Sequence, residues 1–451
     1  MSVSSIEKKL SEFINNEKTG AQGFADYSLD NMRALLRYFG NPEKRILTAH
    51  VAGTNGKGSV VHMLNGILTE AGYACGLYTS PHLQRINERI RIKGREISNP
   101  DLVRHCDECI TAAKKTGVRP TYFDILTLIA IRYFHEMKVD IAIMETGLGG
   151  RLDSTNVVIP LVSVLTDISK DHTGLLGNTI AKIAAEKAGI IKPGIPVITS
   201  NTQRESLNVI RDAARAMHAD LYVVAPDRIG VSEDTGDTKT IKFDFSFEDF
   251  ELADIRITAP GAFQAINASL AIAASRILSK SGFAVSENAI RRGIKNVKIP
   301  GRFAVFSRRP DVIFDPAHNP SAIASLCETL KNVYGSTRFI AVTGFMIDKD
   351  YTAMTRTLVR DLGAQLIYFE LDDRRALTFG EYKRKTTEIA GTDVKGYTDV
   401  DALADLLRAS TDDDTVIIIT GSFRMYAAAK KAAAILRQSR PGRQDRTHAH
   451  K

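Results

Sequence analysis

The stretch ILTAHVAGTNGKGSVVHMLNGILTEAG, residues 46–72, decides the fold of this chain. It begins as a β-rich apolar run, passes through a glycine-rich loop and continues with helical periodicity. A strand that enters a helix through glycines brings the backbone N–H groups of the loop and of the helix N-terminus to one point. Such a point binds phosphate, so the stretch predicts an α/β unit with a phosphate site at its strand end.

The loop itself supplies the groups that a nucleotide needs. Its glycines let the backbone approach closely, Lys57 can reach the β- and γ-phosphates, and Ser59 or Thr54 can face phosphate or Mg²⁺. Gly58 follows Lys57 where the usual motif has Ser or Thr, which makes a switch GTPase or a motor ATPase less favoured. The alternative is a glycine-rich turn without a ligand. The predicted nucleotide-binding residues here are Gly53, Thr54, Asn55, Gly56, Lys57, Gly58 and Ser59.

Working outward, short β-rich runs alternate with helical stretches, a pattern that predicts a parallel sheet covered by helices. The expected strands are residues 46–53, 73–79, 139–147, 161–167 and 196–200, and the expected helices are residues 59–72, 123–138 and 179–189. Residues 227–254 alternate in polarity and predict a small antiparallel excursion before a helix near Phe263. Ligands bind at the carboxyl ends of strands in such sheets, and each strand here ends in a polar or glycine-rich loop.

A second, smaller alternation follows Pro300-Gly301 and predicts a second doubly wound unit. Its expected strands include residues 312–315, 338–344, 364–370 and 415–421. We therefore expect a nucleotide-binding domain over residues 1–299, a hinge at 300–303 and a smaller Rossmann-like domain at 304–436. Residues 437–451 carry a net charge of +4 and are expected to be a disordered basic tail.

Composition excludes several classes of protein. With 451 residues, 44% hydrophobic and 25% charged, the chain is neither a disordered tail, a collagen-like fibre nor a small stapled scaffold. A net charge of +8, half of it in the tail, favours anionic ligands such as nucleotides without implying nucleic acid. An apolar run of about 18 residues, as a membrane span needs, is absent, and the polar start does not resemble a signal peptide. We expect a cytoplasmic protein.

Four scattered cysteines suit a reducing compartment. Cys106 and Cys109 form a C-x-x-C within an expected helix, residues 98–117, where i and i+3 share a face. A second cysteine pair that would support zinc is absent, so we interpret both as structural.

Taken together, the motifs resemble the Mur-type ATP-dependent amide ligases, and in particular their folate branch, the dihydrofolate synthase/folylpolyglutamate synthases. The resemblance runs from Tyr27 to Asp350 in the family's order of motifs. It is carried by YSLDNMRALL, HVAGTNGKGS, TSPHLQRINERIRI, TYFDILTLIA, METGLGGRLDSTN, DHTGLLGNTIAKIAAEKAGIIKPG, IPGRF, DPAHNP and TGFMIDKD.

The resemblance implies a two-domain Mur-ligase-like α/β fold and an ADP-forming carboxylate–amine ligase. Such an enzyme activates a carboxylate with ATP as an acyl phosphate and joins it to L-glutamate. The expected acceptors are dihydropteroate, reduced folates or both; a folylpolyglutamate synthase alone, or another Mur-type ligase such as one acting on peptidoglycan precursors, is the alternative. The alternative from a different functional class is a phosphate-loop NTPase that acts as a regulatory switch and binds partners. We expect a monomer with small-molecule substrates and no nucleic-acid or membrane partner.

Matching family positions imply two Mg²⁺ ions. Ser80 and Glu145 would hold one, and His172 would hold the second together with an N-carboxylated Lys187. A carboxylate that ends an apolar strand is hard to explain as packing, because an unpaired buried charge is costly. The alternatives are a turn hydroxyl for Ser80, a hydrogen-bonded loop histidine for His172, and an ordinary lysine, solvated or paired with Glu186, for Lys187.

Other positions follow from the same resemblance. Arg302 is expected to reach ATP phosphates, Asp315 the ribose, Asn267 the adenine, and His318 the nucleotide or glutamate. Asn267 could instead be a helix-surface amide and Asp315 an N-cap. An aromatic beside a carboxylate suits a flat heterocycle, although Phe123 could belong to the core. The expected pterin-binding residues are Thr121, Tyr122, Phe123, Asp124, Leu152, Asp153 and Ser154.

Overall fold

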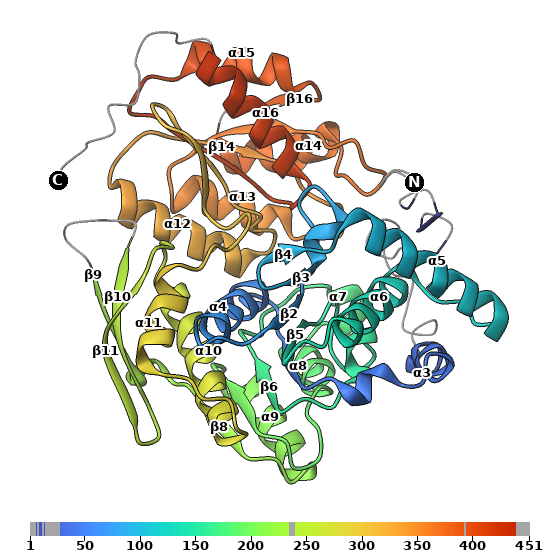
Figure 1. Ribbon diagram of the computed structural model, residues 1–451. Helices are drawn as coiled ribbons and strands as arrows, with labels where there is room; N and C mark the ends of the chain where they lie inside the picture. Colours follow the sequence, from blue (N-terminus) through green and yellow to red (C-terminus); the bar gives the residue numbers. More distant parts are fainter. Residues whose placement is uncertain are drawn as a thin grey trace. The chain divides into compact units, whose positions relative to one another are not determined.

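The computed structural model describes residues 28–233, 240–391 and 394–438, together with residues 6, 9, 10 and 13. The chain divides into two compact units between Ile299 and Pro300, and each unit has its own sheet (Figure 1). Most of the expected tail, residues 439–451, lies outside the described residues. Among the described residues, no helix has the length and apolar character that crossing a bilayer requires.

The first unit is built on an eight-stranded sheet in the order β4-β3-β2-β5-β1-β6-β7-β8. The expected strands are all present, and they pair in parallel: β1 (Thr48–Ala52), β2 (Cys75–Tyr78), β5 (Ile141–Glu145), β6 (Val162–Leu165) and β7 (Val197–Thr199). Sequence reasoning did not predict the parallel edge strand β8 (Leu221–Val223) or the antiparallel edge formed by β3 (Ile90–Ile92) and β4 (Arg95–Glu96). These are edge strands of two or three residues that are only partly buried, and they lack the fully buried pattern of the central strands.

Successive residues of the central strands are buried on opposite faces of this sheet. Ile141 and Ile143 of β5 belong to one hydrophobic cluster, while Ala142 and Met144 belong to another. This period of two is the reason that the strands of a doubly covered sheet are apolar throughout. Helices contribute to both clusters: α3 (Leu29–Tyr38), α5 (Asn99–Thr116) and α6 (Tyr122–Glu136) on one side, and α4 (Lys57–Glu70), α10 (Phe263–Lys280) and α11 (Glu287–Lys295) on the other.

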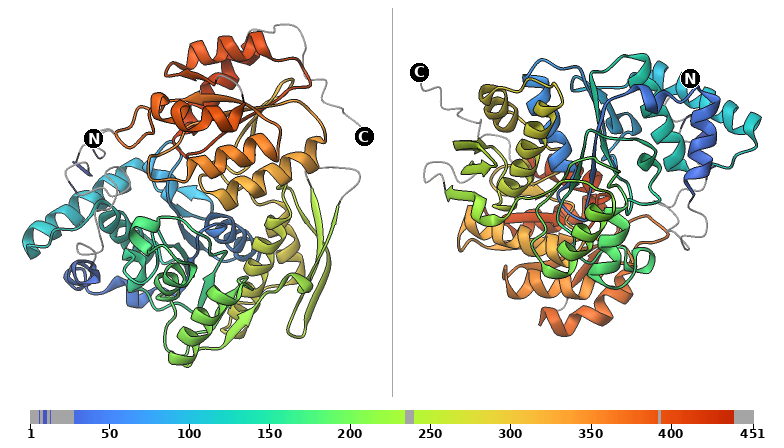
Figure 2. Two further views of the ribbon diagram at one scale, coloured as in Figure 1. Left: turned by 180° about the vertical axis from the view of Figure 1, so that it is seen from behind. Right: turned by 90° about the horizontal axis from the view of Figure 1, so that it is seen from below.

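Toward the β8 edge, the short helix α7 (Thr173–Leu176) leads into α8 (Ile180–Ala188), which packs beside α9 (Arg204–Ala216). The expected antiparallel excursion is a separate three-stranded sheet of β9 (Ile229–Glu233), β10 (Ile241–Phe247) and β11 (Phe250–Ile257). Its β10–β11 hairpin lies alongside α10 and α11 (Figure 2). Phe243 and Phe245 of β10 are buried in the same cluster as α4, which joins this sheet to the core.

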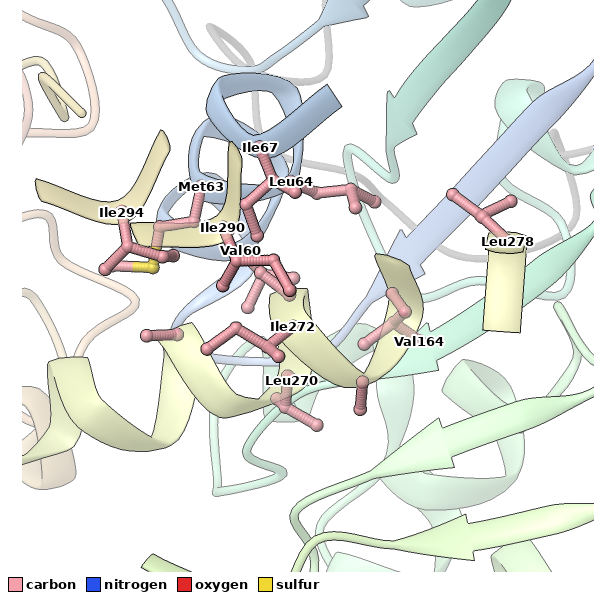
Figure 3. Packing of buried hydrophobic residues seen from close by; sticks show 14 of the residues in the cluster. Val60, Met63, Leu64, Ile67, Val164, Leu270, Ile272, Leu278, Ile290 and Ile294 are labelled. Carbon is pink, nitrogen blue, oxygen red and sulfur yellow. The ribbon is translucent and has the colours of Figure 1, made fainter. Parts of the chain in front are cut away.

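Helix α4 packs on α11 through two glycines. A Cβ at Gly66 would lie 2.7 Å from the carbonyl oxygen of Gly293, and a Cβ at Gly293 would lie 2.5 Å from Cα of Ile67. Apolar side chains of α4 such as Met63 and Ile67 lie beside Ile290 and Ile294 of α11 (Figure 3). The helix that starts at the glycine-rich loop is therefore held within a large hydrophobic cluster.

The second unit has a six-stranded sheet in the order β12-β13-β17-β14-β15-β16. The strands β13 (Asp311–Phe314), β14 (Phe339–Thr343), β15 (Gln365–Phe369), β16 (Lys395–Tyr397) and β17 (Val416–Thr420) are parallel, and β12 (Ala304–Ser307) is antiparallel to β13. The helices are α12 (Pro320–Tyr334), α13 (Tyr351–Arg360), α14 (Phe379–Ala390), α15 (Val400–Ser410) and α16 (Met425–Gln438). Strands β12 and β16 and helix α14 were not predicted.

Candidate active site

The glycine-rich loop, called here the phosphate loop (residues 53–59), adopts a conformation that only glycine tolerates well. Gly53 and Gly56 have φ angles of 155° and 91°, and a Cβ at Gly53 would lie 1.8 Å from Oγ1 of Thr166. Gly56 is the N-cap of α4 and caps no N–H with a side chain. The first N–H groups of a helix have no partner within the helix, and anion sites are commonly built on them.

Thr54 and Asn55 attach the phosphate loop to the segment that follows β6, called here the LTDIS loop (residues 165–169). The N–H of Thr54 donates to the Asp167 carbonyl at 2.7 Å, and its hydroxyl donates to the Ser169 carbonyl at 3.0 Å. The Asn55 amide donates to Oδ2 of Asp167 and to Oγ of Ser169, both at 3.1 Å. Both side chains thus shape the loop. Sequence reasoning missed Asp167 and Ser169, although polar residues at a strand's carboxyl end were a usable signal.

Two lysines converge on one carbonyl of the phosphate loop. Nζ of Lys57 donates to the Gly53 oxygen at 3.0 Å, and Nζ of Lys187, from α8, donates to the same oxygen at 2.7 Å. Lys187 is only 4% exposed. Burial, reinforced by the charge of Lys57, lowers the pKa of Lys187 to about 7. Lys187 is therefore not a solvated lysine, and Glu186 pairs instead with Arg151 at 2.9 Å.

Glu145 and Ser80 meet beside the start of α4. The parallel register sets Glu145 opposite Val51, at the carboxyl ends of β5 and β1. Its carboxylate is 4% exposed, accepts the N–H of Ser80 at 3.2 Å, and would lie 3.9 Å from a Cβ at Gly58. A buried carboxylate next to a serine and a phosphate loop is a donor set that suits a hard cation such as Mg²⁺.

His172 begins α7 with a left-handed backbone, at φ 49°. Its N–H donates to Oδ1 of Asp171 at 2.8 Å, its Nε2 is 3.8 Å from Oδ2 of Asp171, and its side chain is 38% exposed. Asp171 is also one of the carboxylates whose charge opposes the lowering of the Lys187 pKa. The histidine and the buried lysine therefore share an acidic neighbour.

Asn267 lies against the phosphate loop rather than on a helix surface. It is 6% exposed on α10, and a Cβ at Gly56 would lie 2.4 Å from its Oδ1. Its Nδ2 donates to Oε1 of Gln264 at 3.0 Å. The close approach explains why residue 56 lacks a side chain.

Asp153 organises the loop after β5, called here the GLGG loop (residues 147–150). Its carboxylate accepts the N–H groups of Gly147 at 2.8 Å and Leu148 at 2.9 Å, and the N–H and hydroxyl of Thr155 at 3.0 and 2.5 Å. Burial raises the pKa of Asp153, and these hydrogen bonds oppose that shift. Leu152, beside it, is half-buried.

His50 extends this network into the sheet. The Thr155 hydroxyl donates to Asp153, so its oxygen accepts from Nε2 of His50, 2.8 Å away. Nδ1 of His50 is the unprotonated nitrogen and is buried without a hydrogen-bond partner among the described residues. Burial lowers the pKa of His50 to about 3. The sequence analysis did not single out this residue.

The start of α6 is held by a capping box. The Thr121 hydroxyl accepts the N–H of Asp124 at 3.1 Å, while the Asp124 carboxylate accepts the N–H of Thr121 at 2.7 Å and the hydroxyl of Ser154 at 2.5 Å. Phe123 is half-buried, with its ring 2.6 Å from where a Cβ of Gly147 would lie. Tyr122 is buried, with the Arg89 guanidinium 5.7 Å from its ring centre. Of the expected pterin residues, Phe123 and Asp153 thus lie against the GLGG loop, while Thr121, Asp124 and Ser154 are joined by hydrogen bonds at the start of α6.

In the second unit, the expected residues gather at the carboxyl end of β13. Asp315 is not a helix N-cap, because Asn319 caps α12; its carboxylate instead accepts the N–H groups of Phe303 at 2.9 Å and Ala317 at 3.0 Å. Arg302 and His318 both lie beside the ring of Phe423, at 5.1 and 5.7 Å. Phe423 follows β17 and was missed, because nothing in GSFRMYAAA distinguishes it from a core aromatic.

All four cysteines are free and buried. Burial raises the pKa of the Cys106 thiol to about 11 and that of Cys109 to about 12, so both are thiols at neutral pH. They belong to the core cluster around α5 and α6, as their interpretation as structural residues requires.

Known proteins match this chain along most of its length. Residues 51–275 match the Mur ligase middle domain family, and residues 301–423 match the family described as Mur ligase, glutamate ligase domain. A dihydrofolate synthase/folylpolyglutamate synthase from Bacillus subtilis is 38% identical over 410 residues, which are 89% of this chain and 94% of that protein.

Solved structures are similar over nearly the whole chain. Escherichia coli FolC in complex with DHPP and ADP has a TM-score of 0.81 at 32% identity, covering 96% of this chain and 98% of that one. Mycobacterium tuberculosis folylpolyglutamate synthase complexed with ADP has a TM-score of 0.84 at 28% identity, with the same coverage of 96% and 98%.

Proposed function

The chain belongs to the dihydrofolate synthase/folylpolyglutamate synthases of the Mur ligase family, and from that premise we propose that it joins L-glutamate to dihydropteroate and to reduced folates at the expense of ATP. The observation that carries the proposal is the meeting of Lys57, Lys187 and the first turn of α4 around the Gly53 carbonyl, with buried Glu145 beside Gly58. That arrangement suits a triphosphate with a cation.

The reaction proceeds in two transfers. A carboxylate oxygen of the acceptor attacks the γ-phosphorus of ATP, the bond to the β-phosphate oxygen breaks, and ADP leaves. The glutamate amine then attacks the acyl phosphate carbon, phosphate leaves with the electron pair, and the amine releases a proton. Phosphoryl transfer requires positioning and charge neutralisation more than covalent help from the protein. Lys57 and the N–H groups of the phosphate loop supply both.

We propose that two Mg²⁺ ions bind in this site. Ser80 and Glu145 would hold one, and His172 with a carboxylated Lys187 would hold the other. Such ions, when bound, neutralise phosphate charge during the transfer. Only a neutral amine adds CO₂, forming an N–C bond and releasing a proton, and a lysine whose pKa is about 7 is largely neutral in slightly alkaline solution.

The remaining residues fall into two proposed groups. Phe123 offers a ring for the pterin, Asp153 holds the GLGG loop, and Asp124 holds the start of α6 with Thr121 and Ser154. We propose Tyr122 and Leu152 as further residues of the pterin site. In the second unit, Arg302 and Asp315 would reach the nucleotide and His318 the nucleotide or the incoming glutamate, with Asn267 of the first unit at the adenine. We propose a monomeric cytoplasmic enzyme, for which four buried free thiols are suitable.

The acceptor is tested by comparing dihydropteroate with tetrahydrofolate in the presence of ATP, Mg²⁺ and L-glutamate. We expect both acceptors to give stoichiometric ADP, phosphate and a glutamylated product. Activity with tetrahydrofolate but not with dihydropteroate would mean that the chain is a folylpolyglutamate synthase only. ADP release at an equal rate without any acceptor would overturn the ligase proposal, and ligation of peptidoglycan precursors only would assign another Mur-type reaction.

A further inference from the structure

Asn201, two residues beyond the end of β7, is a buried amide whose side chain is fully engaged. It is 6% exposed, and its Oδ1 accepts the N–H of Ile168 at 3.0 Å. Its Nδ2 donates to the carbonyl of Thr166 at 2.7 Å and to Oγ1 of Thr199 at 2.8 Å. The Thr199 hydroxyl in turn donates to the Leu165 carbonyl at 2.9 Å. One amide therefore holds the backbone of the LTDIS loop on both sides of Asp167.

Asp167 and Ser169, in the segment so held, are the partners of the phosphate loop. Their backbone carbonyls accept hydrogen bonds from the N–H and the hydroxyl of Thr54. Their side-chain oxygens accept hydrogen bonds from the Asn55 amide. Thr166, whose carbonyl Asn201 binds, also fills the space that a Cβ at Gly53 would occupy. The contacts run in one series from Asn201 through the LTDIS loop to the residues flanking Gly53.

We infer that Asn201 is a positioning residue for the nucleotide, which it holds in place through the LTDIS loop without touching it. The inference rests on the proposed nucleotide site and adds a residue outside its motifs. An amide is needed because the loop presents a carbonyl and an N–H to the same side chain, and only a group with both an acceptor and donors satisfies them. A buried donor or acceptor left without its partner is costly, so the loop would shift if the amide changed.

The test is Asn201→Asp, which keeps the shape but sets a carboxylate oxygen against the Thr166 carbonyl. Calorimetry with ADP should give a Kd at least about tenfold higher than that of the unchanged protein, or about 1.4 kcal/mol. The KM for ATP should rise in parallel while the KM for L-glutamate stays within about twofold, a split that general loosening would not produce. The matched control is Asn208→Asp, on the exposed face of α9, which should leave the ADP Kd unchanged.

A second variant keeps the test decisive if Asn201→Asp does not fold. Thr199→Val preserves the shape of the side chain but removes one partner of the Asn201 amide. It should raise the ADP Kd about threefold, a smaller loss than that caused by placing a carboxylate oxygen against the Thr166 carbonyl. Equal ADP affinity in a folded variant, or equal losses for ADP and L-glutamate, would overturn the inference alone. Failure of the unchanged protein to bind ADP would overturn the proposed function, and this inference with it.

Discussion

Lys187 is unusual because its amine is buried against a carbonyl and next to a second lysine. Desolvation and the charge of Lys57 both disfavour the ammonium form. We predict that Lys187→Ala lowers ligation by about a thousandfold or more, because the proposed carbamate is lost. The affinity for ADP, measured by calorimetry, should change by less than about threefold. Retention of ligation by the variant would rule out the carbamate.

His50 should make the protein sensitive to acid. Its pKa is about 3 in the folded state and about 6.5 in an unfolded chain, so the unfolded state binds more protons between these values and stability falls as the pH drops through 6.5. At pH 5 the loss from this group should be about 2 kcal/mol. His50→Gln retains a donor for Thr155 and should remove that part of the pH dependence. Urea unfolding of both proteins at pH 7 and pH 5 tests this; equal losses would contradict it.

Gly56 is required for space as well as for backbone conformation. Gly56→Ala should cost about 1–2 kcal/mol of stability through its positive φ, and it should also weaken ADP binding about tenfold because the methyl group displaces Asn267. Gly72→Ala is the matched control. Gly72, just beyond the C-terminal end of α4, also has a positive φ of 98°, but a Cβ there meets nothing within 4 Å. Gly72→Ala should lower the stability, measured by urea unfolding, and should leave the ADP Kd, measured by calorimetry, unchanged.

At the scale of elements, the α4–α11 contact depends on backbone approaching backbone. Replacing a helical glycine by alanine ordinarily stabilises by about 0.5–1 kcal/mol. At Gly66 the added Cβ would lie 2.7 Å from the Gly293 oxygen, so Gly66→Ala should instead destabilise by about 1–2 kcal/mol. Gly380→Ala, in α14 with open space around it, should be neutral or slightly stabilising. Denaturant midpoints for both variants check the difference in sign.

At the scale of the molecule, each unit has hydrophobic clusters of its own among the described residues. The large clusters of the first unit contain residues up to Ile299, and that of the second begins at Phe303. We therefore predict that residues 300–438 alone fold and unfold cooperatively, as judged by circular dichroism during thermal denaturation. Residues 1–299 alone should bind ADP more weakly than the full chain if Arg302 and Asp315 contribute. Equal affinities would exclude that contribution.

Local patterns in the sequence were sufficient for the fold class. The strands of both sheets that were predicted lie in apolar runs and are mostly buried, whereas β3, β4, β8 and β16 are only partly buried, so their formation depends on neighbours. Asn267 and Asp315 show the same limit for side chains. Their burial, against the phosphate loop in one case and beneath two backbone N–H groups in the other, comes from segments distant in the chain.

By itself, the sequence determined the alternation of strands and helices, the glycine-rich phosphate loop and membership of the ligase family, because periodicity and motif order are local properties. Only the tertiary structure decided that Lys187 meets Lys57 on one carbonyl, that His50, Thr155 and Asp153 hold the GLGG loop, and that Asn201 stands behind the LTDIS loop. These contacts join residues far apart in the chain. Burial then alters the pKa values and hydrogen-bonding demands of those residues, and no local pattern encodes that environment.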